Sequence, residues 1–330
     1  MVRLLLNKCR QQANFYNLGS HLIKAGFGGY DHPHALFPPI VGDSLAGKDP
    51  LIGDEATIKS NVLYPRRPTI QGGQINNWDE MEKILDHALS NELRIDPKQY
   101  RLLISDTNFP THENRIKMME VAFESLEVPS LLMMSQAPLS IFSTGNLTGL
   151  IVDSGEYQTS VVPVFSGIAM PHGIRTINFG GRTVTDFLVQ NGVFNQTRRA
   201  TELLKESVSK TSSWTLPGGT SIHVDNFSEF ISETVLQQVI NSSISSVDHD
   251  LETAFNQTTV LCGGNSYLPG FKQKLESINS NLIALADRKY SAWIGGSIIA
   301  GEECFVPENW LDKTEYAEYG PSLSSRLFVT

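Results

Sequence analysis

Hydrophobic residues recur along the first half of the chain in two periods, one typical of helices and one of strands. Asn76–Leu93 and Thr111–Val128 carry apolar residues at helical spacing, so each is predicted to form a helix. Arg101–Ser105 and Leu131–Met134 are short apolar runs of the kind found in buried strands. Because helices and strands alternate, the pattern predicts an α/β fold.

An acidic turn with a glycine lies between two apolar runs in the segment GLIVDSGEYQTSVVPVF. Leu150–Val152 is predicted to be a buried strand that ends at Asp153, and a second strand resumes near Ser160. Backbone amides in such a turn can bind an anion, and Asp153 can hold the waters of a divalent cation. The same letters also form ordinary turns, so the pattern alone leaves both interpretations open.

The same order of strand and small-residue turn recurs along the chain. Thr258–Ile278 places an apolar strand before such a turn and predicts a helix that begins after Pro269. Small-residue turns fall near Gly19–Ser20, Asp153–Gly155 and Gly263–Asn265. This recurrence indicates two related lobes that close on one ligand.

The remaining part of the second half predicts two helices and a hairpin. Arg198–Ser213 is expected to form a polar helix, and Val235–Phe255 one long helix. Trp214–Val224 is expected to form a hairpin that bends at the LPGG sequence.

Composition narrows the class of protein. The 330 residues are 40% hydrophobic and 18% charged, which is typical of a soluble globular protein, and the net charge of −9 argues against a broad basic face for sequence-specific nucleic-acid binding. Cys9, Cys262 and Cys304 lack the spacing of a structural zinc site and fit small buried residues in a reducing compartment. No apolar run reaches the length of a membrane span, and the first residues do not form a convincing signal peptide. We expect a cytoplasmic or nuclear protein.

Several longer blocks resemble actin and the actin-related proteins in the same order. These blocks are KAGFGGYDHPHALFPPIVG, NNWDEMEKILDHALSNELR, QAPLSIFSTGNLTGLIVDSG, IAMPHGIRTINFGGRTVTDF, VLCGGNSYLPG, RKYSAWIGGSIIA and the tail EYAEYGPSLSSRLF. The resemblance covers nearly the whole chain from Gly19 onward, and blocks of this length in a fixed order are far more specific than any single loop.

The resemblance implies a two-lobed α/β fold of the actin, Hsp70 and sugar-kinase (ASKHA) type. ATP or ADP is then expected in a cleft between the lobes, with Mg²⁺ or Ca²⁺ bound through the nucleotide phosphates and water. Residues 1–143 and 291–330 would form the smaller outer lobe, in which 39–68 is a shortened filament-contact subdomain. Residues 144–290 would form the larger inner lobe, in which 180–236 is a shortened subdomain.

The resemblance also implies two phosphate loops and a metal-facing carboxylate. The first loop would contain Gly19 and Ser20, with Lys24 reaching the phosphates as a compact positive charge. Asp153 would lie near the water shell of the metal. The second loop would consist of Gly155, Glu156 and Tyr157.

The resemblance places the nucleoside on a further set of residues and gives one residue a catalytic role. The nucleoside set is Gly263, Gly264, Asn265, Tyr267, Lys205, Glu206 and Lys289. Gln136 corresponds to the glutamine that positions the attacking water. Lys205 and Glu206 also fit the solvated face of a polar helix, and Lys289 fits an ordinary strand edge, so these alternatives stay open.

Five positions depart from the family pattern in the nucleotide site. Asn17 stands in place of an aspartate, His21 and Tyr157 in place of glycines, Ser160 in place of a histidine and Glu202 in place of an arginine. These changes remove a metal-facing charge and a partner of Gln136, and phosphoryl transfer depends on positioning and charge neutralisation. We therefore expect bound adenine nucleotide and, at most, slow ATP hydrolysis.

The segment before the first phosphate loop is unusual. Residues 1–17 are polar after Leu6, where the family has a short apolar strand that ends in aspartate. We expect this segment to fit a first strand poorly, and an incorrectly assigned first exon would also produce it.

Three segments that serve filament contacts in the family are short here. They are residues 42–56, the stretch between Glu206 and WTLPGG, and the stretch DNFSEFISETVLQQ. A head-to-tail interface must repeat in order to extend, so these losses are expected to oppose assembly.

Two functions remain open at this point. One is an actin-like structural protein of the cytoskeleton, whose partners are other actin-family subunits or actin-binding proteins. The other is a non-polymerising scaffold subunit of a larger complex, such as a chromatin remodeller or a dynactin-like assembly. A small-molecule kinase of the same fold is disfavoured, because no motif besides Asp153 offers a carboxylate base for an acceptor hydroxyl.

Overall fold

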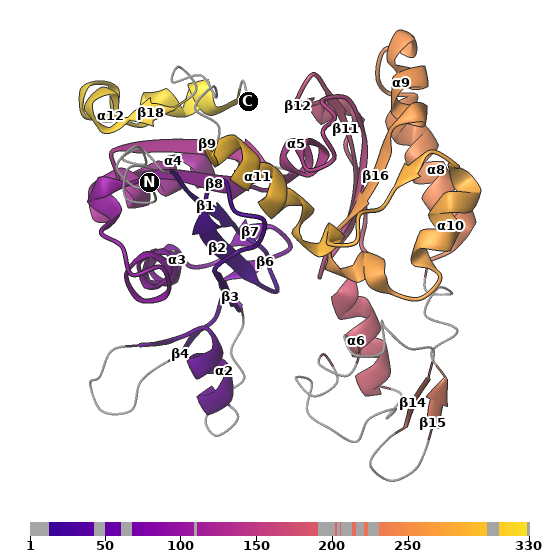
Figure 1. Cartoon of the computed structure of the whole chain (residues 1–330), viewed down its shortest axis with the longest axis horizontal. Helices are drawn as coiled ribbons and strands as arrows, with labels where there is room; N and C mark the ends of the chain where they lie inside the picture. The colour runs from indigo at the N-terminus through magenta and orange to yellow at the C-terminus, as the bar shows by residue number, and fades with distance from the viewer. Residues whose placement is uncertain are drawn as a thin grey trace, which may run out of the picture. The chain divides into compact units, whose positions relative to one another are not determined.

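The structure is a computed structural model, and two compact units divide the chain (Figure 1). Unit 1 comprises Met1–Gly145, Gly167–Ala169 and Ala292–Thr330, and unit 2 comprises Asn146–Ser166 and Met170–Ser291. The structure describes residues 13–42, 50–60, 68–108, 111–190, 202, 205, 213–215, 221–223, 231–301 and 310–328. Most of the predicted helix Arg198–Ser213, including Glu206, lies outside these residues.

The sheet of unit 1 has the strand order β18-β9-β8-β1-β2-β3. Strand β1 runs antiparallel to β2 and parallel to β8, and β8 runs parallel to β9. The strands are β1 Ala13–Asn17, β2 Ile23–Phe27, β3 Ala35–Phe37, β8 Arg101–Asp106, β9 Ser130–Ser135 and β18 Leu311–Asp312. Strands β8 and β9 confirm the two strands predicted for the first half.

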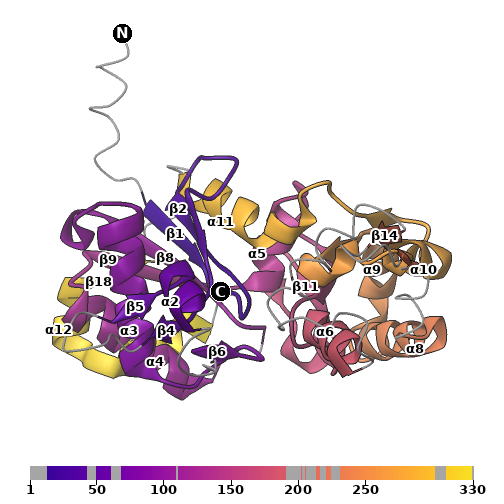
Figure 2. The same cartoon turned by 90° about the horizontal axis from the view of Figure 1, so that it is seen from below.

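Helices cover both faces of this sheet, and Figure 2 shows α3 and α11 on opposite sides of β1. Side chains alternate along β1, so Tyr16 packs into the core formed with α3 and α4, while Phe15 packs with Trp293 of α11. The helices are α3 Trp78–Asp86, α4 His112–Glu120, α5 Gln136–Phe142 and α11 Ser291–Gly301.

The two predicted helices of the first half are confirmed, but each ends in a π-helical turn that the sequence did not predict. Asn77 caps α3 by accepting a hydrogen bond from the Glu80 backbone N–H. Each helix widens into π turns, η1 His87–Glu92 after α3 and η3 Val121–Ser125 after α4. Soon after each, a non-glycine residue adopts a left-handed conformation, Arg94 with φ of 54° and Glu127 with φ of 55°. This conformation ends a helix, because it turns the chain out of the helical path.

The expectation that the segment before Leu18 fits a strand poorly is wrong for Ala13–Asn17. All five residues are buried in β1, between β2 and β8. The sheet nevertheless buries polar atoms there: Asn14 Oδ1 and the Tyr16 hydroxyl have no hydrogen-bond partner among the described residues. Backbone pairing on both edges, together with the apolar faces of Ala13 and Phe15, favours the strand despite this cost.

The sheet of unit 2 contains the predicted pair of strands around the acidic turn. Its order includes β11-β10-β16-β17, and β13 pairs with β11. Strand β10 runs antiparallel to β11, with Asp153 opposite Ser160, and parallel to β16, with Asp153 opposite Cys262. The strands are β10 Gly149–Ser154, β11 Thr159–Phe165, β13 Arg175–Ile177, β16 Thr259–Cys262 and β17 Leu282–Ile283, and the short β12 Ile168–Ala169 follows β11.

In the described part of unit 2, four helices contribute to the core, together with β10 residues such as Leu150 and Val152. They are α6 Gly181–Gln190, α8 Glu233–Ile244, α9 Glu252–Gln257 and α10 Phe271–Ile278. Helix α10 confirms the prediction after Pro269. The single helix predicted over Val235–Phe255 is wrong, because α8 ends at Ile244.

Serine side chains explain this break. The Ser246 hydroxyl donates to the Ser243 carbonyl at 2.8 Å, and the Ser246 N–H donates to the same carbonyl. Hydroxyls that bond to nearby backbone groups compete with the regular hydrogen bonds of a helix. The short turn η6 His249–Leu251 then leads into α9.

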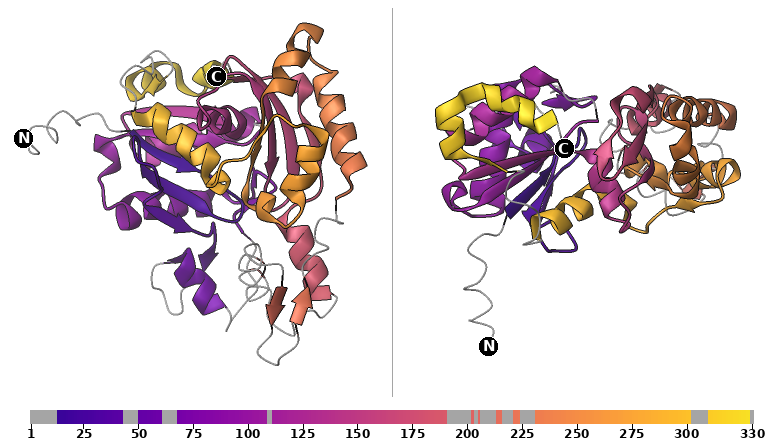
Figure 3. Two further views of the ribbon diagram at one scale, coloured as in Figure 1. Left: turned by 45° about the vertical axis from the view of Figure 1, so that its right-hand side comes forward. Right: turned by 90° about the horizontal axis from the view of Figure 1, so that it is seen from above.

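The remaining elements are short, and Figure 3 shows the chain from two further sides. They are β4 Val41–Gly42, β5 Leu51–Ile52, α2 Asp54–Ser60, β6 Ile70–Gln71, β7 Gln74–Ile75, η2 Pro97–Gln99, η4 Pro171–Gly173, β14 Ser213–Thr215, β15 Ser221–His223, η7 Gly264–Tyr267, η8 Arg288–Tyr290, α12 Lys313–Tyr319 and η10 Gly320–Phe328. Strands β14 and β15 pair with Trp214 opposite Ile222, which confirms the predicted hairpin. None of the helices in the described part of the chain combines the length and the hydrophobicity of a membrane span.

Candidate functional site

The predicted site residues fall into two groups, one in each unit. Unit 1 holds Gly19, Ser20, Lys24 and Gln136, and unit 2 holds the others. Glu206 lies outside the described residues, so the structure does not place it.

In unit 1, Ser105 of β8 binds the residues at which the turn between β1 and β2 begins. Ser105 Oγ accepts hydrogen bonds from Asn17 Nδ2 at 3.0 Å and from the Leu18 N–H at 2.9 Å. Lys24 Nζ donates to Asn17 Oδ1 at 2.9 Å, so the lysine meets a neutral amide at this position. The structure therefore brings together Asn17 and Lys24, and adds Ser105, which the sequence did not single out.

Gln136 is fixed to the backbone of the same turn. Its Nε2 donates to the Leu18 carbonyl at 3.0 Å, and its helix α5 is capped where the Ala137 N–H donates to Asn108 Oδ1 at 3.0 Å. Gly19 lies where a Cβ would be 2.5 Å from the Leu22 carbonyl oxygen and 3.3 Å from Lys24 Nζ. A residue with a side chain would crowd this tight turn, so the turn requires glycine.

A buried ion pair follows Ser105 at the end of β8. Arg115 Nε donates to Asp106 Oδ2 at 2.7 Å, and both side chains are almost fully buried. Burial raises the pKa of the Asp106 carboxyl, and the charge of Arg115 opposes this rise. The pair joins the end of β8 to α4.

In unit 2, the turn between β10 and β11 is docked on the start of α6. The Gly155 N–H donates to the Gln158 carbonyl at 3.0 Å and closes the turn. The Gly155 and Glu156 carbonyls accept from the N–H groups of Gly181 at 2.9 Å and Arg182 at 2.7 Å. The first N–H groups of a helix have no partner within the helix, and here the turn supplies it.

A chain of buried hydroxyl and amide groups joins this turn to the loop after β16. Asn265 Nδ2 donates to Ser154 Oγ at 2.9 Å, and Ser154 Oγ lies 2.7 Å from Thr159 Oγ1. Thr159 Oγ1 donates to the Phe179 carbonyl at 2.8 Å. Ser154, Thr159 and Phe179 were not predicted as site residues, and they hold Asn265 in place.

Asp153 lies against Gly263 at the end of β16. A Cβ on Gly263 would overlap Asp153 Oδ1 and the Ser154 carbonyl, and Gly263 has a φ of 89°, a conformation that favours glycine. The Asp153 carboxylate and the predicted Gly263 loop are therefore adjacent.

Three predicted residues converge on Gly181. A Cβ at Gly181 would lie 2.8 Å from Glu156 Oε2, 2.9 Å from Lys205 Nζ and 3.7 Å from Asn265 Oδ1. Lys205 Nζ donates to the Gly181 carbonyl at 2.7 Å. Asn265 Oδ1 is buried and has no hydrogen-bond partner among the described residues. The arrangement offers a carboxylate, an ammonium and an unsatisfied amide oxygen around one point.

The Tyr267 ring makes a cation–π contact with the Arg288 side chain. The Arg288 guanidinium lies 3.9 Å from the ring centroid, and Arg288 Nε donates to Ser266 Oγ at 2.9 Å. Burial lowers the pKa of Arg288. The Tyr267 hydroxyl donates to the Ala286 carbonyl. Arg288 was not predicted as a site residue.

Gly264 faces the side chain of another predicted residue, Lys289, without close contact. The atoms closest to a Cβ on Gly264 would belong to the Lys289 side chain, at 3.8 Å or more. The structure thus brings Gly263, Gly264 and Lys289 together on one side of unit 2.

Among the described residues, no cluster of three histidine, cysteine or acidic side chains could hold a metal ion directly. In unit 2, Asp153 supplies one carboxylate at the end of β10. A single carboxylate fits a divalent ion that receives most of its ligands from phosphates and water, and it does not fit an ion bound by protein groups alone.

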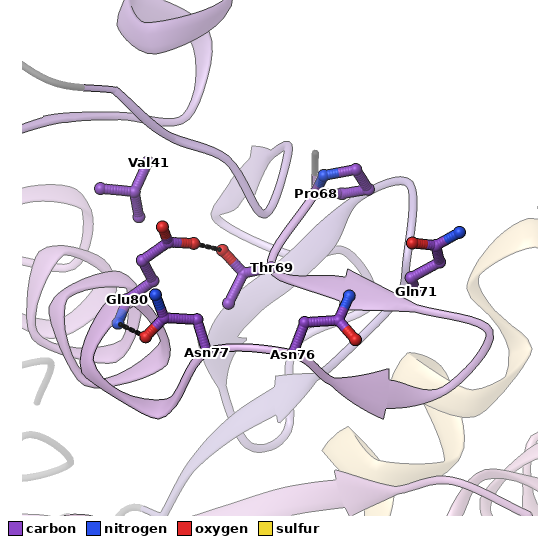
Figure 4. Close-up of a pocket in the computed structure, with 7 residues that line it drawn as sticks. All are labelled: Val41, Pro68, Thr69, Gln71, Asn76, Asn77 and Glu80. Atoms are coloured by element: carbon purple, nitrogen blue, oxygen red, sulfur yellow. Dashed lines mark hydrogen bonds between the residues drawn. The ribbon is translucent and has the colours of Figure 1, made fainter. Parts of the chain in front are cut away.

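A separate cavity of about 400 Å³ lies in unit 1 (Figure 4). Inside it, Thr69 Oγ1 donates to Glu80 Oε2 at 2.7 Å. Its lining contains none of the predicted site residues and comprises Val41, Pro68, Thr69, Gln71, Asn76, Asn77 and Glu80. The convergence on Gly181 is the candidate site, because it joins three of the predicted residues, Glu156, Lys205 and Asn265.

Two α/β units, each with a small-residue turn at the end of a strand, define an actin-like two-lobed fold. The family model described as Actin matches residues 11–197 and 226–328. The chain belongs to the actin family. The matched ranges begin before β1 and include every predicted site residue except Lys205 and Glu206.

Proposed function

We propose that this chain is an actin-like, adenine-nucleotide-binding structural protein of the cytoskeleton with weak or slow ATP hydrolysis. The observation that carries the proposal is the convergence of Glu156, Lys205 and Asn265 on Gly181. Membership of the actin family supports it, because members generally bind a nucleotide and a divalent metal.

The chemistry of the converging groups suits a ribose. A carboxylate and an amide oxygen accept hydrogen bonds from neighbouring hydroxyls, and an ammonium donates one to an oxygen. Asn265 Oδ1 is buried and has no partner within the described part of the chain, so a ligand hydroxyl there would satisfy it. The Tyr267 and Arg288 pair offers a flat surface for the base.

The two turns are proposed to bind the phosphates. Lys24 supplies positive charge in unit 1, and the turn after Asp153 supplies backbone groups in unit 2. Mg²⁺ or Ca²⁺ would be held through phosphate oxygens and water, with Asp153 ordering part of the water shell. The bound metal would neutralise phosphate charge.

Slow hydrolysis is proposed from the surroundings of Gln136. Gln136 is held against the first turn by its bond to the Leu18 carbonyl, where it would orient water. Ser160, which replaces a histidine, is buried in β11 and carries no ring nitrogen to assist it. Asn17 also leaves one charge fewer for the metal.

The test is nucleotide binding by the purified full-length protein. We expect ATP or ADP to co-purify, and saturating nucleotide at about 100 times Kd to stabilise the fold by about 2.7 kcal/mol. Lys205→Met should weaken ADP binding about tenfold, while Lys98→Met, at an exposed lysine paired with Glu127, should leave it unchanged. Protein that holds no nucleotide and gains no thermal protection would contradict the proposal.

A non-polymerising scaffold role is the second candidate. Residues 198–225 fall outside the family match, and the resemblance to actin implies that this segment is shortened. Partners would then be other actin-family subunits or actin-binding proteins within a larger complex, in the cytoplasm or nucleus. Sedimentation with ATP and Mg²⁺ separates the two, because a filament former pellets and a scaffold subunit stays in the supernatant.

A further inference from the structure

Tyr157 occupies the tip of the turn between β10 and β11, and its ring is held in place. The Tyr157 hydroxyl accepts a hydrogen bond from Arg182 Nη1 at 2.8 Å. The Arg182 guanidinium carbon lies 5.1 Å from the ring centroid, and Arg182 Nε lies 3.6 Å from Asp186 Oδ2. Contacts with both the edge and the face of the ring therefore fix the tyrosine against α6.

The backbone of the turn is fixed as well. The Gly155 and Glu156 carbonyls accept from the first N–H groups of α6, and Gly180 packs so closely that a Cβ there would lie 2.5 Å from the Glu156 carbonyl oxygen. The turn therefore cannot retreat from its position without breaking these bonds. A ligand that approaches the turn must accommodate the tyrosine ring.

The turn does not need glycine for its backbone shape. Tyr157 does not have a positive φ. Among the described non-glycine residues, only Arg94, Glu127 and Ser166 do. The consequence of tyrosine is therefore the volume of its side chain. Turns that bind pyrophosphate commonly use glycine so that the backbone can approach the phosphates closely.

We infer that Tyr157, held by Arg182, restricts the phosphate end of the site and makes this chain selective for nucleoside diphosphates over triphosphates. The inference rests on the proposed function, because it assumes that the phosphates of a bound nucleotide reach this turn. A diphosphate ends before the ring, whereas a third phosphoryl group competes with the ring for the same space.

The experiment compares the affinities for ADP and for a non-hydrolysable ATP analogue by calorimetry, with Mg²⁺ present. The wild-type chain should bind ADP at least about tenfold more tightly than the analogue. Tyr157→Gly should reduce this ratio to about threefold or less, mainly by strengthening analogue binding. Tyr157→Phe keeps the ring and loses the hydroxyl, so it should retain the preference.

Thermal unfolding of each variant shows that a changed ratio belongs to a folded protein. Equal affinity of the wild type for both ligands, or loss of the preference in Tyr157→Phe, would overturn the selectivity while leaving the proposed function intact. Absence of binding by either ligand would instead overturn the proposed function.

Discussion

Lys24 Nζ donates a 2.9 Å hydrogen bond to Asn17 Oδ1, so a neutral amide faces the ammonium at the root of the first turn. Asn17 is buried and is also anchored to Ser105. A carboxylate at this position would have the same size and would face the same lysine. The pair therefore isolates the effect of one charge in the proposed nucleotide site.

Asn17→Asp should increase the Mg²⁺ dependence of nucleotide affinity by about tenfold. Bonds to charged groups are about twice as strong as neutral ones, and an added carboxylate can order the waters of the cation. Calorimetry with Mg²⁺ and with a chelator measures the effect, and Asn91→Asp on the exposed end of η1 is the control. An unchanged Mg²⁺ dependence would show that residue 17 does not act on the metal.

Tyr16→Phe should stabilise the fold by about 1–2 kcal/mol. The Tyr16 hydroxyl is fully buried without a partner among the described residues, and burial raises its pKa well above the usual value. Tyr316→Phe is the matched control, because the Tyr316 hydroxyl donates to Glu124 at 2.6 Å and its removal should destabilise. Urea unfolding measures the stability of both variants. Equal effects would show that the buried Tyr16 hydroxyl does not destabilise β1.

Gly263→Ala should destabilise unit 2 by at least about 2 kcal/mol. The substitution places a Cβ against Asp153 Oδ1 at a φ of 89°, and left-handed backbone alone costs about 1–2 kcal/mol for a residue with a side chain. Its neighbour is the control: in Gly264→Ala the new Cβ meets nothing closer than 3.8 Å, so the loss should stay below about 1 kcal/mol. Thermal unfolding of the two variants checks the difference.

Arg115→Met should destabilise unit 1 by about 3–5 kcal/mol at neutral pH, because it leaves the Asp106 carboxylate buried without its cation. Burial already raises the pKa of Asp106, so the folded state binds this proton more readily than the unfolded chain does. Removal of Arg115 raises that pKa further. The deficit of the variant should therefore shrink as the pH falls and Asp106 is protonated.

Urea unfolding at pH 7 and pH 5 measures this change. Lys117→Met removes the exposed partner of Glu120 and should show no comparable recovery at the lower pH. A deficit in Arg115→Met that is the same at both values would show that Asp106 does not carry the effect.

Local sequence patterns predicted those elements whose burial or boundary is marked by their own residues. The apolar run before Asp153 and the proline before α10 placed β10 and the start of α10 correctly. The resemblance to actin is confirmed by the family match. In α11, Trp293 is buried but Ile298 is 43% exposed, because five residues along a helix bring the chain to another face.

Contacts between distant residues could not be predicted from local patterns. Residues 13–17 form a central strand only because β2 and β8 pair with both edges. The orientation of the Asn265 amide depends on its bond to Ser154, which lies 111 positions earlier, and the Asp106–Arg115 pair depends on how α4 packs on β8. The roles of the site residues remain predictions.

The packing of Trp293 on Phe15, with ring centroids 6.3 Å apart, has a consequence during protein synthesis. The central strands are complete by Ser135, but the helix that covers one of their faces follows about 160 residues later, a delay of roughly 8–30 s at ribosomal speeds of about 5–20 residues per second. For that interval Phe15, Leu103 and Leu132 lack the part of their core that Trp293 and Ile299 of α11 supply. Chains released before Trp293 would therefore be prone to aggregate.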